Sequence, residues 1–222
     1  DLAEAADRGK VADRLGAGVI TALLGKAVVP GDVPYHTQQL GLLGSKPSYE
    51  MMSSCDTLLM VGSNFPYGEF LPDTGQARGV QIDLLPRHLS LRYPMEVNLW
   101  GDAKATLSAL LPLLDQTDDL SWQDGIAADM RTWDRMIEEA AKVSADPINP
   151  RLVFHSLNRR LPADAIVTAD AGTTADWYGH HIRLGRDQMG NLSGRLATML
   201  AAMPYAIAAK FAHPDRPVFA LV

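Results

Sequence analysis

The sequence predicts an α/β protein built on parallel sheets, and three observations support this class. Short apolar runs, such as residues 57–61 and 165–169, have the composition and length of buried strands. These runs alternate with longer segments whose apolar residues recur at helical spacing. Turn-rich segments follow the ends of the runs, as at 62–66. Alternating strands and helices favour a parallel sheet with helical crossovers.

The composition excludes several functional classes. The 222 residues are 47% apolar and 21% charged, which is typical of a globular protein, and the net charge of −6 argues against a nucleic-acid-binding face. A single cysteine, Cys55, excludes a disulfide framework and a Cys-rich metal site. Pro204 and Lys210 interrupt the most apolar stretch, and the first ten residues contain no apolar leader segment. We expect a cytoplasmic protein with no nucleic-acid partner and no membrane association.

The first half of the chain should contain the first sheet. We expect a helix over 1–15, a strand over 18–23 and a helix over 46–54, followed by strands at 57–61, 79–83 and 97–100. Asp102 is a good N-cap for the next helix. The apolar stripe of that helix is formed by Ala103, Leu107, Leu110, Leu111 and Leu114.

The second half begins after a polar segment at 115–121. We expect a charged helix over 122–143, a proline-containing linker over 144–150, helices over 151–160, 173–181 and 194–211, and strands at 165–169 and 216–222. This pattern divides the chain into a first domain at 1–115, a connector at 116–149 and the opening of a second domain at 150–222. The first helix lacks a cap and the last strand lacks its following loop, so we expect a longer parent protein.

Three segments carry residues suited to a cofactor. Asp83 closes a strand, where a carboxylate can accept hydrogen bonds from a ribose or can simply close a turn. The glycine turns at 41–44 and 62–66 would let backbone approach a ligand, although each is also an ordinary tight turn. The segment 170–174 follows an apolar strand and opens a helix, which suits a diphosphate. Alternatively, Asp170 or Thr173 caps that helix.

Other familiar chemistries find no support in the sequence. The one Gly-x-Gly, at 16–18, precedes a strand, whereas the dinucleotide-binding pattern follows one. The turn at 41–44 lacks the Lys-Ser/Thr ending of the Walker pattern. None of the six histidines has paired zinc-ligand spacing, and no Gly-x-Ser-x-Gly elbow is present. We therefore assign no metal ligand to this chain.

Taken in order, several segments resemble the thiamine diphosphate-dependent enzymes of the pyruvate oxidase and acetolactate synthase family. The segments that resemble the Rossmann-like middle domain are Thr21-Ala-Leu-Leu-Gly-Lys26, Gly41-Leu-Leu-Gly-Ser-Lys-Pro47, Leu59-Met-Val-Gly-Ser-Asn-Phe-Pro-Tyr67, Val80-Gln-Ile-Asp83 and Gly101-Asp-Ala-Lys104. Those that resemble the start of the diphosphate-binding domain are Thr168-Ala-Asp-Ala-Gly-Thr173, Leu192-Ser-Gly194, Ala197-Thr-Met199 and residues 204–210.

This resemblance implies a thiamine diphosphate site in the second domain. Its residues would be Ala171, Gly172, Thr173 and Thr174 at the diphosphate, with Thr198 and Met199 at the organic rings. Met199 would be the apolar support that bends the cofactor; alternatively it is a core methionine of an apolar helix. The family usually has glycine after this methionine, whereas Leu200 stands here. The activating glutamate and the Mg²⁺ motif would lie outside this sequence, so no catalytic residue is assigned and the fragment alone should be inactive.

The resemblance also implies an FAD site in the first domain. Its residues would be Gly41, Leu42, Leu43, Gly44, Gly62, Ser63, Asn64, Phe65, Asp83, Leu84 and Asp102. Relatives bind FAD, ADP or nothing there. The implied activity is decarboxylation of a small 2-oxo acid such as pyruvate with thiamine diphosphate, Mg²⁺ and FAD, as in pyruvate oxidase or quinone-linked pyruvate dehydrogenase. The alternatives are an acetolactate synthase-type carboligase and a non-catalytic nucleotide-binding module. The complete protein should be a homodimer or homotetramer.

Overall fold

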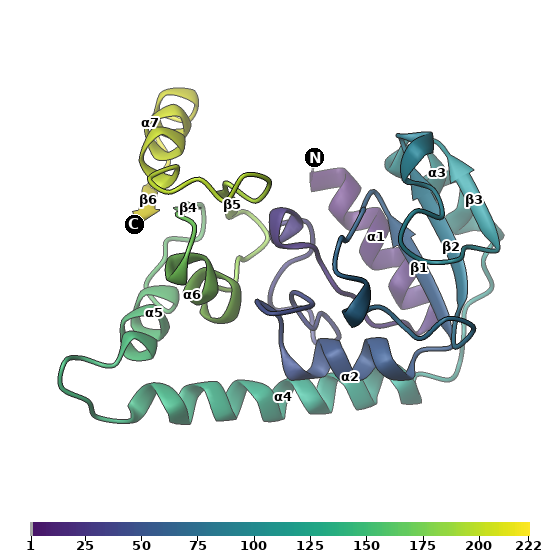
Figure 1. Cartoon of the computed structure of the whole chain (residues 1–222), viewed down its shortest axis with the longest axis horizontal. Helices are drawn as coiled ribbons and strands as arrows, with labels where there is room; N and C mark the ends of the chain where they lie inside the picture. The colour runs from purple at the N-terminus through teal and green to yellow at the C-terminus, as the bar shows by residue number, and fades with distance from the viewer. Residues whose placement is uncertain (1) are drawn as a thin grey trace.

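The computed structural model describes the backbone of residues 2–222 and the side chains of residues 9–222. Over these residues the chain forms two three-stranded parallel sheets, which confirms the predicted α/β class (Figure 1). The first sheet has the order β1–β2–β3, with β1 at Thr57–Val61, β2 at Arg78–Asp83 and β3 at Val97–Trp100. The second has the order β5–β4–β6, with β4 at Ile166–Ala169, β5 at Met189–Leu192 and β6 at Val218–Leu221.

Helices surround and connect the two sheets. They are α1 (Leu2–Leu15), α2 (Lys46–Ser54), α3 (Ala103–Leu110), α4 (Ser121–Lys142), α5 (Pro150–Asn158), α6 (Thr173–His181) and α7 (Ala202–Ala212). The sequence predicted α2 and α6 with these bounds and α4 to within one residue at each end. The Asp102 cap is also confirmed, because its carboxylate accepts a hydrogen bond from Ala105 N at 2.9 Å.

The first sheet buries one face against α1 and α3. Ile82 of β2 and Leu107 of α3 are almost completely buried with Val11 of α1, and they form a small apolar core. The next residue along β2, Gln81, points to the opposite face because side chains alternate along a strand. There its amide holds the loop that follows β2, accepting from Ser90 N at 2.9 Å and donating to His88 O at 3.2 Å.

The same alternation organises the second sheet. Val167 and Ala169 face the apolar core built with Tyr178 of α6. Thr168, between them in sequence, faces α7 and donates its hydroxyl hydrogen to Ala202 O at 2.9 Å. The central strand β4 is therefore covered on both faces, as expected for a parallel sheet.

Helix α4 connects the two halves and lies alongside both of them (Figure 1). Near its start, Gln123 donates to Ala17 O at 3.0 Å, and Ile126 packs beside Gly18. Farther along, Asp134 forms an ion pair with Arg183, in the segment after α6. A helix of 22 residues is about 33 Å long. This length lets one element contact both halves.

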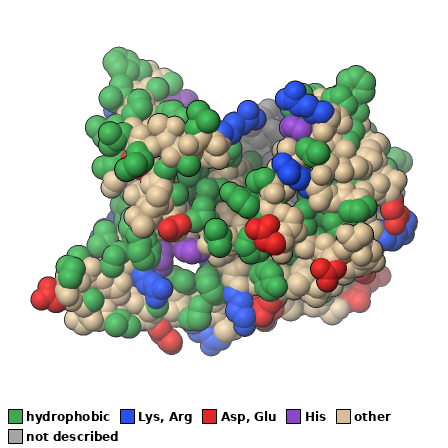
Figure 2. All heavy atoms as spheres, in the orientation of Figure 1, with side chains coloured by type: hydrophobic (Ala, Val, Ile, Leu, Met, Phe, Trp, Pro, Cys, Tyr) green, Lys and Arg blue, Asp and Glu red, His purple; other side chains and the backbone are tan. Residues whose placement is uncertain are grey.

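Helix α7 leaves much of its apolar surface uncovered. It buries Ala202 against the second sheet, while Met203, Ile207 and Phe211 stay exposed. Figure 2 shows apolar side chains gathered at the end of the molecule where α7 lies in Figure 1. No helix in the described part of the chain is long and apolar enough to cross a membrane.

Two predicted elements are wrong. The predicted strand at 18–23 is an extended segment in which Val19 forms one isolated parallel bridge with His36. Backbone hydrogen bonds join the two segments from Val19 N to Tyr35 O, from Thr37 N to Val19 O and from Thr21 N to Gln38 O, but no regular strand forms, and Gln38 has a positive φ of 72°. The predicted helix at 194–211 begins only at Ala202, because Ala197 and Leu200 have positive φ values that a right-handed helix excludes.

The predicted helical crossovers are confirmed in the second sheet, where α6 lies between β4 and β5 and α7 between β5 and β6, but the first sheet differs. Helical crossovers were expected, but the chain passes from β1 to β2 and from β2 to β3 through loops with single 3₁₀ turns at Gly68–Phe70 and Pro86–His88. Strand β5 was not predicted, because Gly190 and Asn191 give it neither an apolar run nor strand composition.

The packing of Gly79 gives a first prediction. A Cβ at this position would lie 2.9 Å from Pro94 O and 3.1 Å from Met95 Cα, which are backbone atoms that cannot rotate away. We expect Gly79→Ala to lower the free energy of unfolding by about 1–3 kcal/mol in urea titrations. Gly125→Ala is the matched control, since it lies in α4 with nothing within 4 Å of its Cβ. This variant should gain about 0.5–1 kcal/mol; equal effects at the two positions would contradict the packing described.

Candidate functional site

Apart from the Gly41–Gly44 turn, which precedes α2, the predicted cofactor residues lie at the carboxyl ends of the parallel strands. Those of the first sheet form the first-sheet edge, comprising Gly62–Phe65 after β1, Asp83 and Leu84 at the end of β2, and Asp102 after β3. Those of the second sheet form the second-sheet edge, comprising Ala171–Thr174 after β4, with Thr198 and Met199 in the loop after β5. Open α/β sheets bind ligands at such edges.

At the second-sheet edge, Gly172 is the N-cap of α6. Its φ of 72° and ψ of −146° are accessible almost only to glycine. No side chain caps this helix, and space is open around the position where a Cβ would stand. The N–H groups of Thr173 and Thr174 occupy the first helical turn, where no intrahelical acceptor exists. This arrangement suits an anionic ligand.

Asp170 does not cap α6, which was an alternative considered in the sequence analysis. Its two carboxylate oxygens accept hydrogen bonds from Leu200 N at 2.7 Å and Ala201 N at 2.8 Å. Asp170 therefore ties the 193–201 loop to the end of β4. It also satisfies two backbone N–H groups at the start of α7, where a helix needs acceptors.

The 193–201 loop presents its side chains to the outside. Thr198 N donates to Ser193 Oγ at 3.1 Å, and Met199 is 78% exposed. The alternative that Met199 is a core methionine of an apolar helix is wrong, because the residue is neither helical nor buried. Its exposed thioether is available for contact with a ligand.

Leu200, which stands where the resemblance leads to glycine, has a φ of 62°. This left-handed conformation suits glycine and costs a residue with a Cβ about 1–2 kcal/mol. The leucine side chain is 68% exposed and so recovers little by packing. The backbone at position 200 therefore has the geometry that favours glycine, although the residue here is leucine.

At the first-sheet edge, two glycine turns meet. Gly41 has a φ of 90°, and a Cβ there would contact the ring of Phe65 at 3.4 Å and that of Phe70 at 3.5 Å. Gly62 has a φ of 58° with nothing within 4 Å of the Cβ position. The structure thus brings the predicted turns 41–44 and 62–65 together and leaves backbone accessible at Gly62.

The two carboxylates of this edge are already engaged within the protein. Asp83, which is buried, accepts from Leu85 N at 2.8 Å, and its other oxygen lies 3.4 Å from His88 Nδ1. Asp102 caps α3 and is exposed. Asp83 therefore closes a turn, which was one of the two roles considered for it in the sequence analysis. A ligand could reach the exposed Leu84 more readily than the buried Asp83 carboxylate. The sequence analysis did not predict the contact of His88 with Asp83, because His88 belongs to no recognisable sequence motif.

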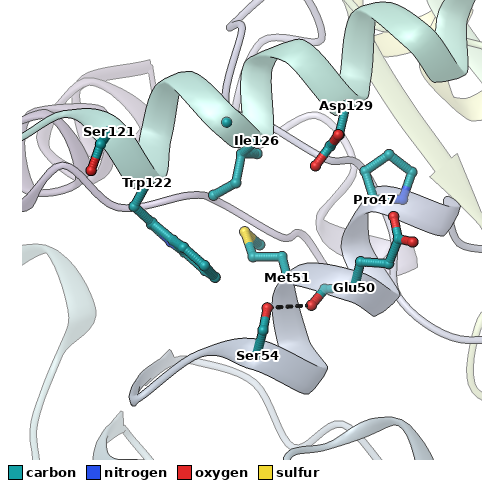
Figure 3. Close-up of a pocket in the computed structure, with 9 residues that line it drawn as sticks. Pro47, Glu50, Met51, Ser54, Ser121, Trp122, Ile126 and Asp129 are labelled. Carbon is teal, nitrogen blue, oxygen red and sulfur yellow. Dashed lines mark hydrogen bonds between the residues drawn. The ribbon is translucent and has the colours of Figure 1, made fainter.

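A pocket of about 160 Å³ lies between α2 and α4, away from both edges. Figure 3 shows Trp122 at one end, Glu50 and Asp129 at the other, and Met51 and Ile126 between them. None of the predicted cofactor residues lines this pocket. Within the described part of the chain, no three His, Cys, Asp or Glu side chains gather in a way that could hold a metal ion.

Comparison with known proteins adds independent information. The family model described as "Thiamine pyrophosphate enzyme, central domain" matches residues 4–110. This match includes the whole first sheet and the glycine turns at its edge.

Curated relatives match over most of the chain. YdaP of Bacillus subtilis (strain 168), whose designation as a thiamine pyrophosphate-containing protein is provisional, is 33% identical over 95% of this chain and 36% of its own length. Acetolactate synthase isozyme 2 large subunit of Escherichia coli (strain K12) is 31% identical, over 88% and 35%. Pyruvate oxidase of Lactiplantibacillus plantarum is 27% identical, over 88% and 33%. The chain spans about a third of the length of these relatives.

The geometry of Leu200 gives a second prediction. Leu200→Gly removes the left-handed strain of about 1–2 kcal/mol and adds an unfolded-state entropy cost of about 0.5–1 kcal/mol. We expect its free energy of unfolding to be unchanged or up to about 1.5 kcal/mol higher in urea titrations. Leu196→Gly is the control, because Leu196 is 86% exposed and has no positive φ. It should lose about 0.5–1 kcal/mol; equal losses in both variants would contradict the strain.

Proposed function

The chain belongs to the thiamine diphosphate-dependent enzyme family, and from this premise we propose that it is part of a flavin-linked enzyme that decarboxylates a 2-oxo acid, of the pyruvate oxidase type. The observation that carries the proposal is the start of α6. There an uncapped helix, a glycine-only backbone and open space stand directly after the central strand of the second sheet.

The chain's own groups fit a diphosphate at this position. The N–H groups of Thr173 and Thr174 would donate to phosphate oxygens, and the positive end of the helix dipole favours their charge. A side chain at Gly172 would occupy the space through which the phosphate approaches. We assign no Mg²⁺ ligand to this chain.

Thr198 and Met199 would hold the organic part of the cofactor. Asp170 fixes their loop through two backbone hydrogen bonds, so the exposed Met199 side chain is presented on an anchored segment. An apolar side chain placed in this way can orient a ring by contact and exclude water beside it. When bound, thiamine diphosphate supplies the carbanion-stabilising chemistry that allows a 2-oxo acid to lose carbon dioxide.

We propose that the first-sheet edge holds FAD in a domain spanning 1–115, followed by the connector at 116–149 and the diphosphate-binding segment at 150–222. The accessible backbone at Gly62 and the adjoining Gly41–Gly44 turn support this assignment. Pyruvate oxidase, whose name states an oxidation, is among the relatives. The buried Asp83 carboxylate would act indirectly, by shaping the turn that presents Leu84.

A carboligase of the acetolactate synthase type is the second candidate, favoured by the 31% identity to that E. coli subunit. A non-catalytic module is a third, suggested by Leu200 in place of glycine, but the retained left-handed backbone at Leu200 argues for a preserved site. The complete protein would be a homodimer or homotetramer, which is consistent with the uncovered apolar surface of α7.

The third prediction tests the activity. The protein expressed from its complete reading frame should be yellow, and its flavin absorbance should bleach when pyruvate is added anaerobically with thiamine diphosphate and Mg²⁺. A sample without thiamine diphosphate is the control and should keep its colour. Carbon dioxide release from a colourless protein would contradict the flavin-linked proposal. Acetolactate formation without flavin reduction would select the carboligase, and no turnover of any 2-oxo acid would select the non-catalytic module.

The fourth prediction tests the diphosphate site. Thr173→Pro removes one N–H at the first helical position, where proline is structurally tolerated. Because a hydrogen bond to a charged group contributes about 1.5–3 kcal/mol, we expect thiamine diphosphate affinity to fall about 10- to 150-fold in calorimetric titration, with thermal stability retained. Ala103→Pro makes the same change at the first position of α3, and affinity should not change. Unaltered affinity in Thr173→Pro would remove this helix from the site.

A further inference from the structure

Lys26 is a buried residue that has no role in the function proposed above. Its side chain is buried, with the residue only 2% exposed, and its ammonium donates to Gln39 Oε1 at 2.7 Å and to Gly179 O at 2.9 Å. Gln39 in turn donates to Thr21 Oγ1 at 3.0 Å. Lys26 therefore joins the segment before the first sheet to α6, which opens at the second-sheet edge.

The position of Gly179 in α6 determines how the hydrogen bond from Lys26 affects this helix. Gly179 lies in the last turn of the helix, where carbonyl groups lack intrahelical donors and the dipole is negative. A buried cation at this end stabilises the helix in the same sense as an anion at the other end. Lys26 and a diphosphate at Gly172 would thus complement opposite ends of one helix.

Two further contacts join the same helical turn to the candidate flavin turn. A Cβ at Gly179 would lie 3.1 Å from Leu43 O and 3.3 Å from Leu43 Cβ, so the turn packs directly on the helix backbone. The imidazole of His180 also lies close to the backbone of Gly44. The Gly41–Gly44 turn is therefore fixed to one end of α6, about 10 Å along the helix from Gly172.

We propose that Lys26 is a positioning residue that couples the two candidate cofactor sites through α6. The coupling rests on the proposed function, since it concerns FAD at the first-sheet edge and thiamine diphosphate at the second. FAD bound at the Gly41–Gly44 turn would stabilise the contact of this turn with Gly179, and the turn and Lys26 together hold the C-terminal end of α6. This places the N–H groups at the helix start for the diphosphate. By reciprocity, each cofactor raises the affinity of the other.

The titratable groups around Lys26 set the pH range of this effect. Burial, and secondarily Arg183, lowers the pKa of Lys26 to about 7. Burial also lowers the pKa of His36 to about 4 and lowers that of His180, which lies near Asp176. The Tyr178 ring lies 5.5 Å from the ammonium, and burial raises its pKa. Lys26 is therefore the group in this set that changes charge between pH 6 and 8.5.

The fifth prediction is a linkage experiment on the protein expressed from its complete reading frame. Thiamine diphosphate with Mg²⁺ is titrated with and without saturating FAD, and the ratio of the two Kd values measures the coupling. We expect a ratio of about 5- to 50-fold in the parent protein. The ratio should be larger at pH 6 than at pH 8.5, because the charged ammonium complements the helix end more strongly. Lys26→Met should bring the ratio to within twofold of one and abolish its pH dependence.

Two variants and one parent measurement complete the test. Lys46→Met removes an exposed lysine paired with Glu50 and should keep the parent ratio. Gly179→Ala retains Lys26 but presses a methyl group against Leu43, and should also reduce the ratio, which keeps the test valid if Lys26→Met does not fold. A parent protein that binds both cofactors with a ratio of one overturns the coupling alone, as does an unchanged ratio in a folded Lys26→Met or Gly179→Ala variant. Failure to bind either cofactor overturns the proposed function as well.

Discussion

Lys26 carries an ammonium group into a part of the protein that water scarcely reaches, and the surrounding chain is arranged to accept its hydrogens. Within the described residues its hydrogen bonds go to an amide oxygen and a helix carbonyl, and Arg183 lies near enough to oppose its charge. A buried cation in such a setting is costly unless its hydrogen bonds are complete. Gln39 and Gly179 are therefore constrained together, although 140 residues separate them in sequence.

The constraint explains why the segment around Lys26 is ordered without forming strands. Polar side chains add to the few backbone hydrogen bonds between residues 19–21 and 35–38: Ser45 Oγ donates to Thr37 O at 2.6 Å, and Thr21 Oγ1 lies 3.1 Å from His36 Nε2. These residues are buried, so each hydrogen bond satisfies a group that solvent cannot. The result is a rigid polar layer between the first sheet and α6. It adjoins the Gly41–Gly44 turn, which packs on the helix at Gly179, and it is one of the contacts between the two halves of the chain.

The sequence predicted the elements whose signals are local. Helix α2 has a Ser45 cap and proline near its start, and β1 is an unbroken apolar run, so both were predicted with the observed bounds. Strand β5 and the 193–201 loop depend on distant partners. β5 is defined by pairing with β4, and the loop by the Asp170 carboxylate some 30 residues away. For the site, the sequence predicted which residues gather at each edge, but not that His88 engages Asp83 or that Lys26 caps α6.

The 193–201 loop shows how the backbone can hold a left-handed conformation at a residue other than glycine. Two backbone N–H groups bound to one carboxylate fix the chain direction at Leu200 and Ala201, whatever side chain stands there. The positive φ at Leu200 is then imposed by Asp170, and its cost is small beside the loss of two hydrogen bonds to a charged group. A leucine can therefore replace glycine without moving Met199. In this chain the Asp170 carboxylate holds the loop, and the leucine at the strained position costs some stability without changing those two hydrogen bonds.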